Sequence, residues 1–348
     1  MGHAMDQRDH DVLRHLRATR ASPPGLANSG SRRRTYTAAM QQFEELWEAS
    51  RQIGYHSRPL PLFYAMEQLG RAIGASRLQA NGGQLQGGHG LTVAGNDYAR
   101  PIHNVAMAAR GKGSAHAVAA AIGEKLPSAE MTIGALWSSL PEGMTDRLPG
   151  DQSPNALAVE SLDPERPSTV FRMSRRAEAR LHFLPERFST LDSSDARREL
   201  TEFLSMYPTS AGWEMPPELG YRVGVGSDDD TFVRLDWMTG DQGSSGSAAT
   251  RRRHLLETVG QEYRWTGFAV MRPAIAGEPA PGLFLTWWVI LFGLSMFARY
   301  QPELWSKHLD VNASVAATVV ETIMNDALTV IPPLALELLT GRKILEEP

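Results

Sequence analysis

The chain has 348 residues, with 35 Lys or Arg, 39 Asp or Glu and no Cys. This length allows two domains or one large one, and a hydrophobic content of 42% is enough for a sizeable core. The composition excludes a disordered chain, a collagen and a disulfide-stapled secreted module. Thiol nucleophiles, zinc–thiolate sites and iron–sulfur clusters are excluded because each needs Cys. The net charge of -4 argues against a dedicated nucleic-acid coat protein.

The basic charge is concentrated near the N-terminus. Residues 1–34 hold seven Arg against three Asp and contain no apolar run of the kind found in a secretory signal. Residues 21–31 are rich in Pro, Gly and Ser, which is typical of a flexible linker. We therefore predict a disordered basic segment over 1–34, a folded body that starts near Arg34, and a short tail over 341–348.

Several helices are expected in the first half of the chain. Apolar residues at three-to-four spacing predict a helix over 35–53 that ends at Gly54. Pro59 and Pro61 predict the start of a second helix, because a missing N–H costs little in the first turn. A short loop between the two predicts an antiparallel pair. Residues 114–126 predict another helix, and Thr132 should cap a short one that ends at Pro141.

The middle of the chain has a mixed pattern. Residues 142–168 are rich in Pro and indicate an irregular connection. A helix is expected over 194–206, a polar loop over 240–250 and a hairpin over 221–238. The predicted strands are 168–173, 179–184, 221–225, 231–238 and 262–272.

Residues 282–298 contain no charge in 17 positions, the lower limit for a membrane span. Trp287 and Trp288 lie inside the run, whereas an aromatic belt would place them at its ends. A helix that is apolar all round also occurs at the centre of a large domain. No other segment is expected to span, and Pro332 and Pro333 are expected to break the apolar stretch after residue 313. We predict a buried core helix, with a membrane anchor as the alternative.

Two features indicate a ligand site. The Gly-rich loop from Gly82 to Gly90 has the backbone freedom to approach a phosphate, although neither a P-loop nor a βαβ unit surrounds it. His89, between Gly88 and Gly90, is a general base, a phosphate ligand or a packed turn residue. Arg299, directly after the apolar run, is either a ligand contact at the rim of the core or a cap on the helix C-terminus.

A metal-independent ribonuclease site is a further hypothesis. Arg51 would hold the scissile phosphate and His56, with four residues between them, would move the 2′-hydroxyl proton. Several such pairs are expected by chance in a chain with so many Arg and with 10 His. The acidic run 228–230 is either a cation site or a solvated turn, and the basic run 251–254 is either a contact for an acidic partner or a solvated segment. We predict no cofactor and no metal.

Several short segments resemble the YaaC-like family of bacterial proteins. They are Arg58-Pro-Leu-Pro-Leu-Phe-Tyr64, Ala72-Ile73, His89-Gly90-Leu91, Thr132 to Pro141, and Leu294-Ser-Met-Phe-Ala-Arg-Tyr300 followed by Trp305. The resemblance covers roughly residues 40–340 and is poor in the centre. It implies a cytoplasmic, mainly helical protein with a small β insertion, and it brings no established reaction.

Together these patterns predict an α+β fold that is mainly α. One domain over 35–340 would combine helices from 35–140 and 282–340 with a β layer from 155–275. For function we keep three hypotheses. They are a non-enzymatic accessory protein of a stress or anti-phage system that binds a protein partner or itself, the ribonuclease that uses Arg51 and His56, and a small-nucleotide sensor that uses His89 and Arg299.

Overall fold

The computed structural model describes residues 7–85, 87–161, 176–190, 193–210, 213–214, 223–225, 231–238, 261–262 and 268–341. The fold is α+β and mainly α, as predicted. The chain divides into a helical unit (1–137, 146–152 and 280–348) and a sheet unit (138–145 and 153–279). The helical unit is built from both ends of the chain, as expected. We expected a single domain, but the middle of the chain forms a compact unit with its own core.

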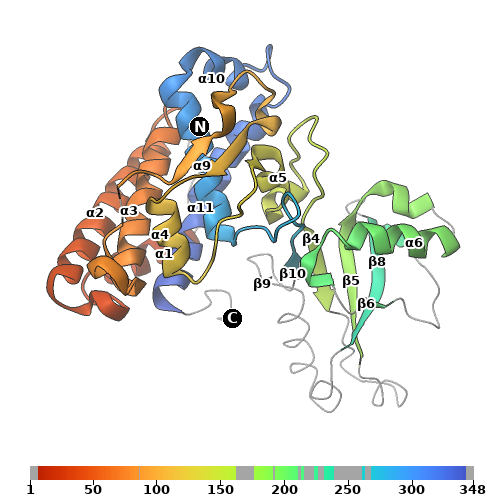
Figure 1. Ribbon diagram of the computed structural model, residues 1–348, viewed down its shortest axis with the longest axis horizontal. Helices are drawn as coiled ribbons and strands as arrows, with labels where there is room; N and C mark the ends of the chain where they lie inside the picture. The colour runs from red at the N-terminus through yellow and green to blue at the C-terminus, as the bar shows by residue number, and fades with distance from the viewer. Residues whose placement is uncertain are drawn as a thin grey trace. The chain divides into compact units, whose positions relative to one another are not determined.

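The helical unit contains most of the helices and a small antiparallel sheet of order β1-β2-β3 (Figure 1). Its strands are β1 (Leu91–Val93), β2 (Ala106–Ala109) and β3 (Met131–Thr132). Its helices are α1 (Gln7–Ala18), α2 (Gly30–Gln52), α3 (Pro59–Arg77), α4 (Ser114–Ala121), α5 (Ile133–Ser138), α9 (Leu283–Tyr300), α10 (Pro302–Leu309) and α11 (Ala317–Thr340).

The predicted helix pair is confirmed as α2 and α3, which pack along each other. α3 begins at Pro59, where the absent N–H would have had no helical partner. Thr132 caps α5 as predicted, since its Oγ1 accepts the N–H of Ala135 at 3.1 Å. α2 begins earlier than expected, and α4 ends at Ala121 rather than near residue 126.

The prediction of a disordered N-terminal segment is wrong from residue 7 onward. α1 buries Val12 and Leu16, and the short 3-10 helix Gly25–Asn28 buries Ala27. The arginines of this segment are used inside the fold. Arg32 donates to the carbonyls of Ala75 and Leu78 at 3.1 and 2.8 Å, which satisfies open carbonyls at the C-terminus of α3. The linker-like composition of 21–31 therefore encodes tight turns rather than a mobile arm.

α9 is the central helix of this unit (Figure 1). Fourteen of its 18 residues are buried, and it contacts α3, α4, α10 and α11. The ring of Trp288 fills the space in front of Gly70, where a Cβ would lie 2.5 Å from the ring. Two helices are long and apolar enough to cross a membrane, Leu283–Tyr300 with 78% of its apolar window buried and Ala317–Thr340 with 50%.

The predicted break at Pro332 and Pro333 is wrong, because both prolines lie inside α11. The expectation that only one segment is long and apolar enough to span a membrane is therefore wrong as well. The helix continues through both prolines to Thr340, and Gly341 ends it with a φ of 70°. An internal proline costs about 3 kcal/mol in an isolated helix. Here the buried side chains of Val330, Ile331 and Pro332 offset that cost.

The sheet unit is built on an antiparallel sheet of order β6-β8-β5-β4-β10-β9, with β7 also paired to β8. The strands are β4 (Leu157–Ser161), β5 (Arg176–Leu184), β6 (Trp213–Glu214), β7 (Val223–Val225), β8 (Thr231–Met238), β9 (Gln261–Glu262) and β10 (Phe268–Met271). Helix α6 (Ser193–Leu204) contributes Leu200, Phe203 and Leu204 to a core that also holds Phe188.

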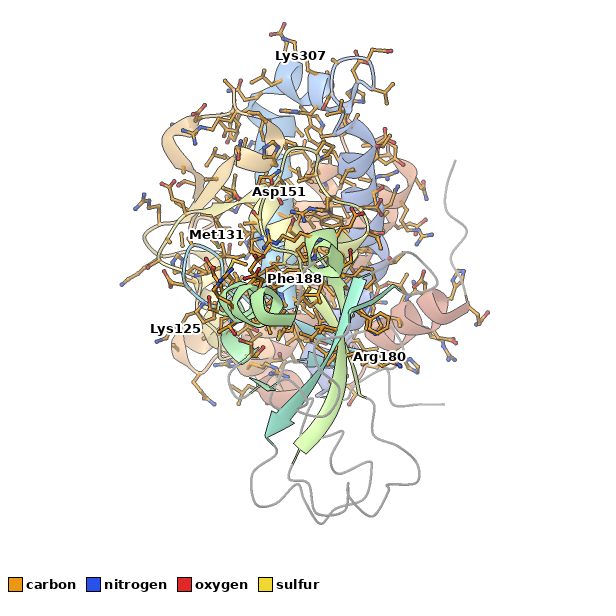
Figure 2. The ribbon with its side chains drawn as sticks, turned by 90° about the vertical axis from the view of Figure 1, so that its right-hand side faces the viewer. Lys125, Met131, Asp151, Arg180, Phe188 and Lys307 are labelled. Carbon is orange, nitrogen blue, oxygen red and sulfur yellow. The ribbon has the colours of Figure 1, made fainter. Side chains whose placement is uncertain are left out.

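Alternation along β5 separates the two faces of this sheet. Ala179 and Leu181 lie in the core, whereas Arg180 and His182 lie on the opposite face, where both contact Glu160 of β4. Figure 2 labels one residue of each face, Phe188 on the core side and Arg180 on the other. The charged face is therefore internally paired at these positions.

Most predictions for the sheet unit are confirmed. The hairpin over 221–238 is the β7–β8 pair, and the helix over 194–206 is α6. The prediction of an irregular connection over 142–168 is wrong at 157–161. There β4 pairs with β5 and β10, because Leu157 and Val159 complete the core. The single strand expected over 262–272 is two short strands that pair with each other. The predictions for 168–173, 228–230, 240–250 and 251–254 lie outside the described residues.

Tyr36 gives the helical unit a predictable response to high pH. It is fully buried, its hydroxyl donates to Thr19 Oγ1 at 2.7 Å, and burial raises its pKa from 10.0 to about 12. The folded chain therefore holds this proton at pH values where the unfolded chain has lost it. Stability is fully present below pH 10 and falls between pH 10 and 12, by about 2–3 kcal/mol for this group. Urea unfolding across that range should show a smaller loss for Tyr36→Phe, and an equal loss would contradict this account.

Candidate functional site

A buried glutamate organises the candidate site. Glu67 lies on α3 with 9% of its side chain exposed. A carboxylate in such a place needs hydrogen-bond partners. Glu67 Oε1 accepts from His89 Nδ1 at 2.9 Å and from the hydroxyl of Ser114 at 2.6 Å. Two segments distant in sequence therefore meet on one carboxylate oxygen.

His89 is held in place on several sides. Its ring lies 5.2 Å from that of Phe63 on α3 and 5.6 Å from that of Phe292 on α9. The flanking Gly88 and Gly90 have φ angles of 80° and 72°, which favour glycine, so the predicted need for backbone freedom is confirmed. A Cβ on Gly90 would lie 2.6 Å from His116 Nδ1. The imidazole keeps 35% of its side chain exposed, which leaves one edge open to a ligand.

The hydrogen bonds separate this cluster from a catalytic triad. In a triad the serine hydroxyl bonds to the histidine and the histidine bonds to the carboxylate. Here the Ser114 hydroxyl bonds to Glu67 directly and Ser114 is buried. His89 is therefore not placed between the serine and the acid. The arrangement orients a histidine by its Nδ1 and leaves Nε2 on the side away from the carboxylate.

The start of α4 is occupied by the chain itself. The N–H groups of Ser114 and Ala115 donate to the carbonyls of Gly88 and His89 at 2.9 and 3.1 Å. A phosphate at a helix N-terminus needs such N–H groups. This geometry disfavours a phosphate at α4, and the proposed cradle over Gly82 to Gly90 stays a prediction.

Arg299, in the last turn of α9, contacts α3 one residue along from the residue that contacts His89. Its Nη1 donates to the hydroxyl of Tyr64 at 3.4 Å, and its guanidinium lies 4.9 Å from the ring centre of Tyr300. Tyr64 is the neighbour of Phe63, which contacts His89. The two ligand-site candidates from the sequence therefore lie along the same junction between α3 and α9.

A second arginine joins this junction from α3. Tyr64, Glu67 and Arg71 stand at i, i+3 and i+7, which places them on one face of the helix. Arg71 and Arg299 are exposed, and Tyr64 and Tyr300 are 39% and 51% exposed. We call the set Tyr64, Arg71, His89 and Arg299 the α3 strip.

Tyr98 borders the α3 strip behind Tyr300. It is buried, and its ring meets that of Phe297 edge-on at 5.2 Å. Burial raises the pKa of Tyr98, and the neighbouring Tyr300 raises it further. Tyr98 is therefore neutral at physiological pH and acts as a hydrogen-bonding aromatic group.

The ribonuclease pair lies elsewhere on the helical unit. Arg51 is in the last turn of α2, with its Nε 3.9 Å from Glu48 Oε2. His56 is exposed in the loop before α3, and its carbonyl accepts the indole N–H of Trp305 at 2.9 Å. The catalytic role of this pair stays a prediction. Among the residues that the structure describes, no group of three or more His, Asp or Glu is placed to hold a metal ion.

Sequence reasoning missed Glu67, Ser114, Tyr64 and Arg71. Glu67 carried a signal, since it is the acidic residue within the apolar stretch of α3. Its partners lie 22 and 47 residues away, and no sequence spacing indicates that they meet.

One of three comparisons with known proteins identifies the family of this chain. The model of the YaaC-like protein family matches residues 9–339, which is nearly the whole chain. No curated protein and no solved structure matches the chain. The family match includes α1 as well as the segments that first suggested the resemblance. The chain therefore belongs to the YaaC-like protein family.

Proposed function

We propose that this protein is a non-catalytic binding protein whose α3 strip docks an acidic segment of a protein partner. One observation supports this most. In the described part of the chain, no carboxylate pairs with Arg71 or Arg299, whereas Arg17 and Arg100 each have a carboxylate within 3.0 Å. These two exposed guanidinium groups belong to α3 and α9, the two helices that contact His89. Without a carboxylate partner they favour an acidic partner.

The aromatic residues of this surface support a protein partner. Tyr and Arg are enriched at the centres of protein interfaces, where they provide large contact areas and directed hydrogen bonds. Tyr64 and Tyr300 are large, exposed and next to Arg299. The same residue types on an open surface suit a docked chain better than a small ligand, which needs an enclosed pocket.

The small-nucleotide hypothesis has less support at this place. Two open hollows of about 420 and 500 Å³ lie on the helical unit, lined by residues between 94 and 130 and between 7 and 48. Neither is lined by a residue of the α3 strip. The cytoplasmic location and the role in a stress or anti-phage system also stay predictions, and they depend on the identity of the partner.

Fluorescence anisotropy tests the proposal with a labelled peptide of 17 residues that carries three Glu in an Ala-rich sequence. We expect binding by the wild-type protein and about a tenfold loss of affinity in the double variant Arg71→Gln with Arg299→Gln, because two charge pairs are removed. Arg77→Gln is the matched control, since Arg77 is an exposed arginine on the same helix and outside the strip. It should bind as the wild type does.

Two other probes in the same assay, ATP and a short RNA, give the results that would contradict the proposal. ATP or an RNA of 12 nucleotides that binds more tightly than the peptide, with the same loss in the double variant, would replace the protein partner by a nucleotide or nucleic acid. Cleavage of that RNA, abolished by His56→Ala, would favour the ribonuclease. Equal binding of the peptide by the wild type and the double variant would remove the strip from the interaction.

A further inference from the structure

We propose that the charged face of the sheet unit binds a nucleobase that carries an exocyclic amino group, from a free nucleotide or from single-stranded RNA. The site lies where β5 pairs with β8, at the centre of the sheet. Figure 2 shows Arg180, which belongs to this site, on the side of the sheet away from Phe188. The site is separate from the α3 strip, and its ligand is a planar ring rather than an acidic peptide.

A β-bulge in β5 brings an additional aromatic residue to the charged face. The register of β5 against β8 shifts by one residue between Leu181 and Leu184, so His182 and Phe183 together stand opposite the single residue Phe232. Leu181 and Leu184 both lie in the core. In a regular strand Phe183, and not Leu184, would follow Leu181 on the core side. The bulge therefore keeps Phe183 out of the core, and bulges re-aim side chains in this way next to functional sites.

Phe183 has a backbone conformation that is costly for its residue type. Its φ angle is 66°, in the left-handed region that glycine and asparagine adopt readily and that bulky residues avoid. The residue is half-buried and is not a member of the core cluster. Strained residues of this kind are concentrated at ligand sites, where binding rather than packing maintains them. The strain therefore points to a ligand at Phe183.

The neighbours of Phe183 form a surface that suits a flat ring. Phe232 is half-buried, and the guanidinium carbon of Arg180 lies 5.3 Å from its ring centre. The ring of His182 lies 5.4 Å from that of Phe232, with 35° between the two planes. On the other side of Phe232, β7 places Gly224, which has no side chain, directly opposite. Aromatic rings combined with Arg bind nucleobases by stacking, because every base has a π face.

A carboxylate beside these rings has one oxygen available to a base. Glu160 stands opposite Arg180 in the register, and its Oε2 accepts from Arg180 Nη1 at 3.3 Å and lies 3.2 Å from His182 Nε2. No described residue donates to Oε1, and 33% of the side chain is exposed. Because Glu160 and Arg180 neutralise each other, the pair suits an uncharged base better than a phosphate. Oε1 can accept from the exocyclic amino group of adenine, cytosine or guanine, which uracil lacks.

Isothermal titration calorimetry with AMP, CMP, GMP and UMP tests the site. We expect UMP to bind at least about fivefold more weakly than the tightest of the other three, because only uracil lacks the amino group. Fluorescence anisotropy with a labelled RNA of eight nucleotides identifies the source of the base. Tighter binding of the RNA than of any nucleotide would identify single-stranded RNA, and equal or weaker binding a free nucleotide. Binding of UMP as tight as that of the others, or no binding by any probe, would overturn the proposal.

Variants of the two phenylalanines link this binding to the charged face. Phe183→Asn and Phe232→Leu should each weaken binding about tenfold, since each removes a stacking ring. Asn adopts a positive φ readily, so Phe183→Asn should unfold at a temperature no lower than that of the wild type. A lower unfolding temperature would show that the Phe183 ring serves the fold, and it would overturn the proposal. Unchanged binding in both variants would overturn it as well.

Arg187→Gln is the matched control for Arg180→Gln. Each guanidinium carbon lies close to a phenylalanine ring centre, at 5.1 Å from Phe188 for Arg187 and at 5.3 Å from Phe232 for Arg180. Only Arg180→Gln should weaken binding of the probe that binds most tightly. Equal effects of the two substitutions would show that the general charge of the sheet unit, and not this face, determines binding, and would overturn the assignment.

Discussion

Trp288→Ala should destabilise the helical unit by about 3–5 kcal/mol, a large part of the stability of a typical domain. Trp288 is fully buried on α9, and its ring meets those of Phe63 and Phe284 at centroid distances of 6.1 Å. Truncation leaves a cavity at the place where α9 packs on α3. Urea unfolding followed by circular dichroism measures the loss.

Gly70 provides the matched comparison for Trp288. A Cβ at Gly70 would lie 2.5 Å from the indole ring, so Gly70→Ala should destabilise the wild type but have a smaller effect when Trp288 is already Ala. Additive effects of the two substitutions would show that the two positions do not touch. A loss below about 1 kcal/mol for Trp288→Ala would contradict the central place of α9.

Gly113→Ala should cost about 3 kcal/mol and also impair binding at the α3 strip. A Cβ at Gly113 would collide with the backbone N of Gly90 and lie 2.7 Å from the carbonyl carbon of His89. These atoms belong to the main chain, so the collision can be relieved only by moving the two segments apart. That movement would disturb the hydrogen bonds of Glu67, because its Oε1 accepts from His89 on one segment and from Ser114 on the other.

Gly87→Ala is the control for this substitution. Nothing lies within 4 Å of a Cβ at Gly87, so the variant should be nearly as stable as the wild type. Thermal unfolding and peptide anisotropy measure both effects for the two variants. Similar behaviour of Gly113→Ala and Gly87→Ala would contradict the close packing of the two glycine segments.

Periodic apolar patterns predicted the main helices because burial on one face determines them. The stripes of α2 and α3 and the uncharged run of α9 were recognised for this reason, as was the cap at Thr132. Predictions from composition were wrong where tertiary contacts determine the local structure. Residues 21–31 read as a linker, yet Arg33 donates to the carbonyls of Ala21 and Asn28 and fixes the turn.

The candidate site was only partly accessible from sequence. Its members His89 and Arg299 were recognised from their flanking residues, a pair of glycines and an apolar run. Glu67, which orients His89, was not recognised, because a hydrogen bond across 22 residues leaves no periodic signal. The spacing of Arg71 against Tyr64 was visible in the sequence, but it had no meaning until His89 was placed beside Glu67.

Photo-crosslinking of the acidic peptide tests the central claim most directly, since it reports where the peptide lies on the wild-type protein. A benzophenone residue next to the central Glu, followed by digestion and mass spectrometry, identifies the contacted segments. The account predicts crosslinks to residues 60–71, 88–90 and 296–301, which hold the α3 strip and Tyr300. Crosslinks confined to α1 or to the sheet unit would contradict it.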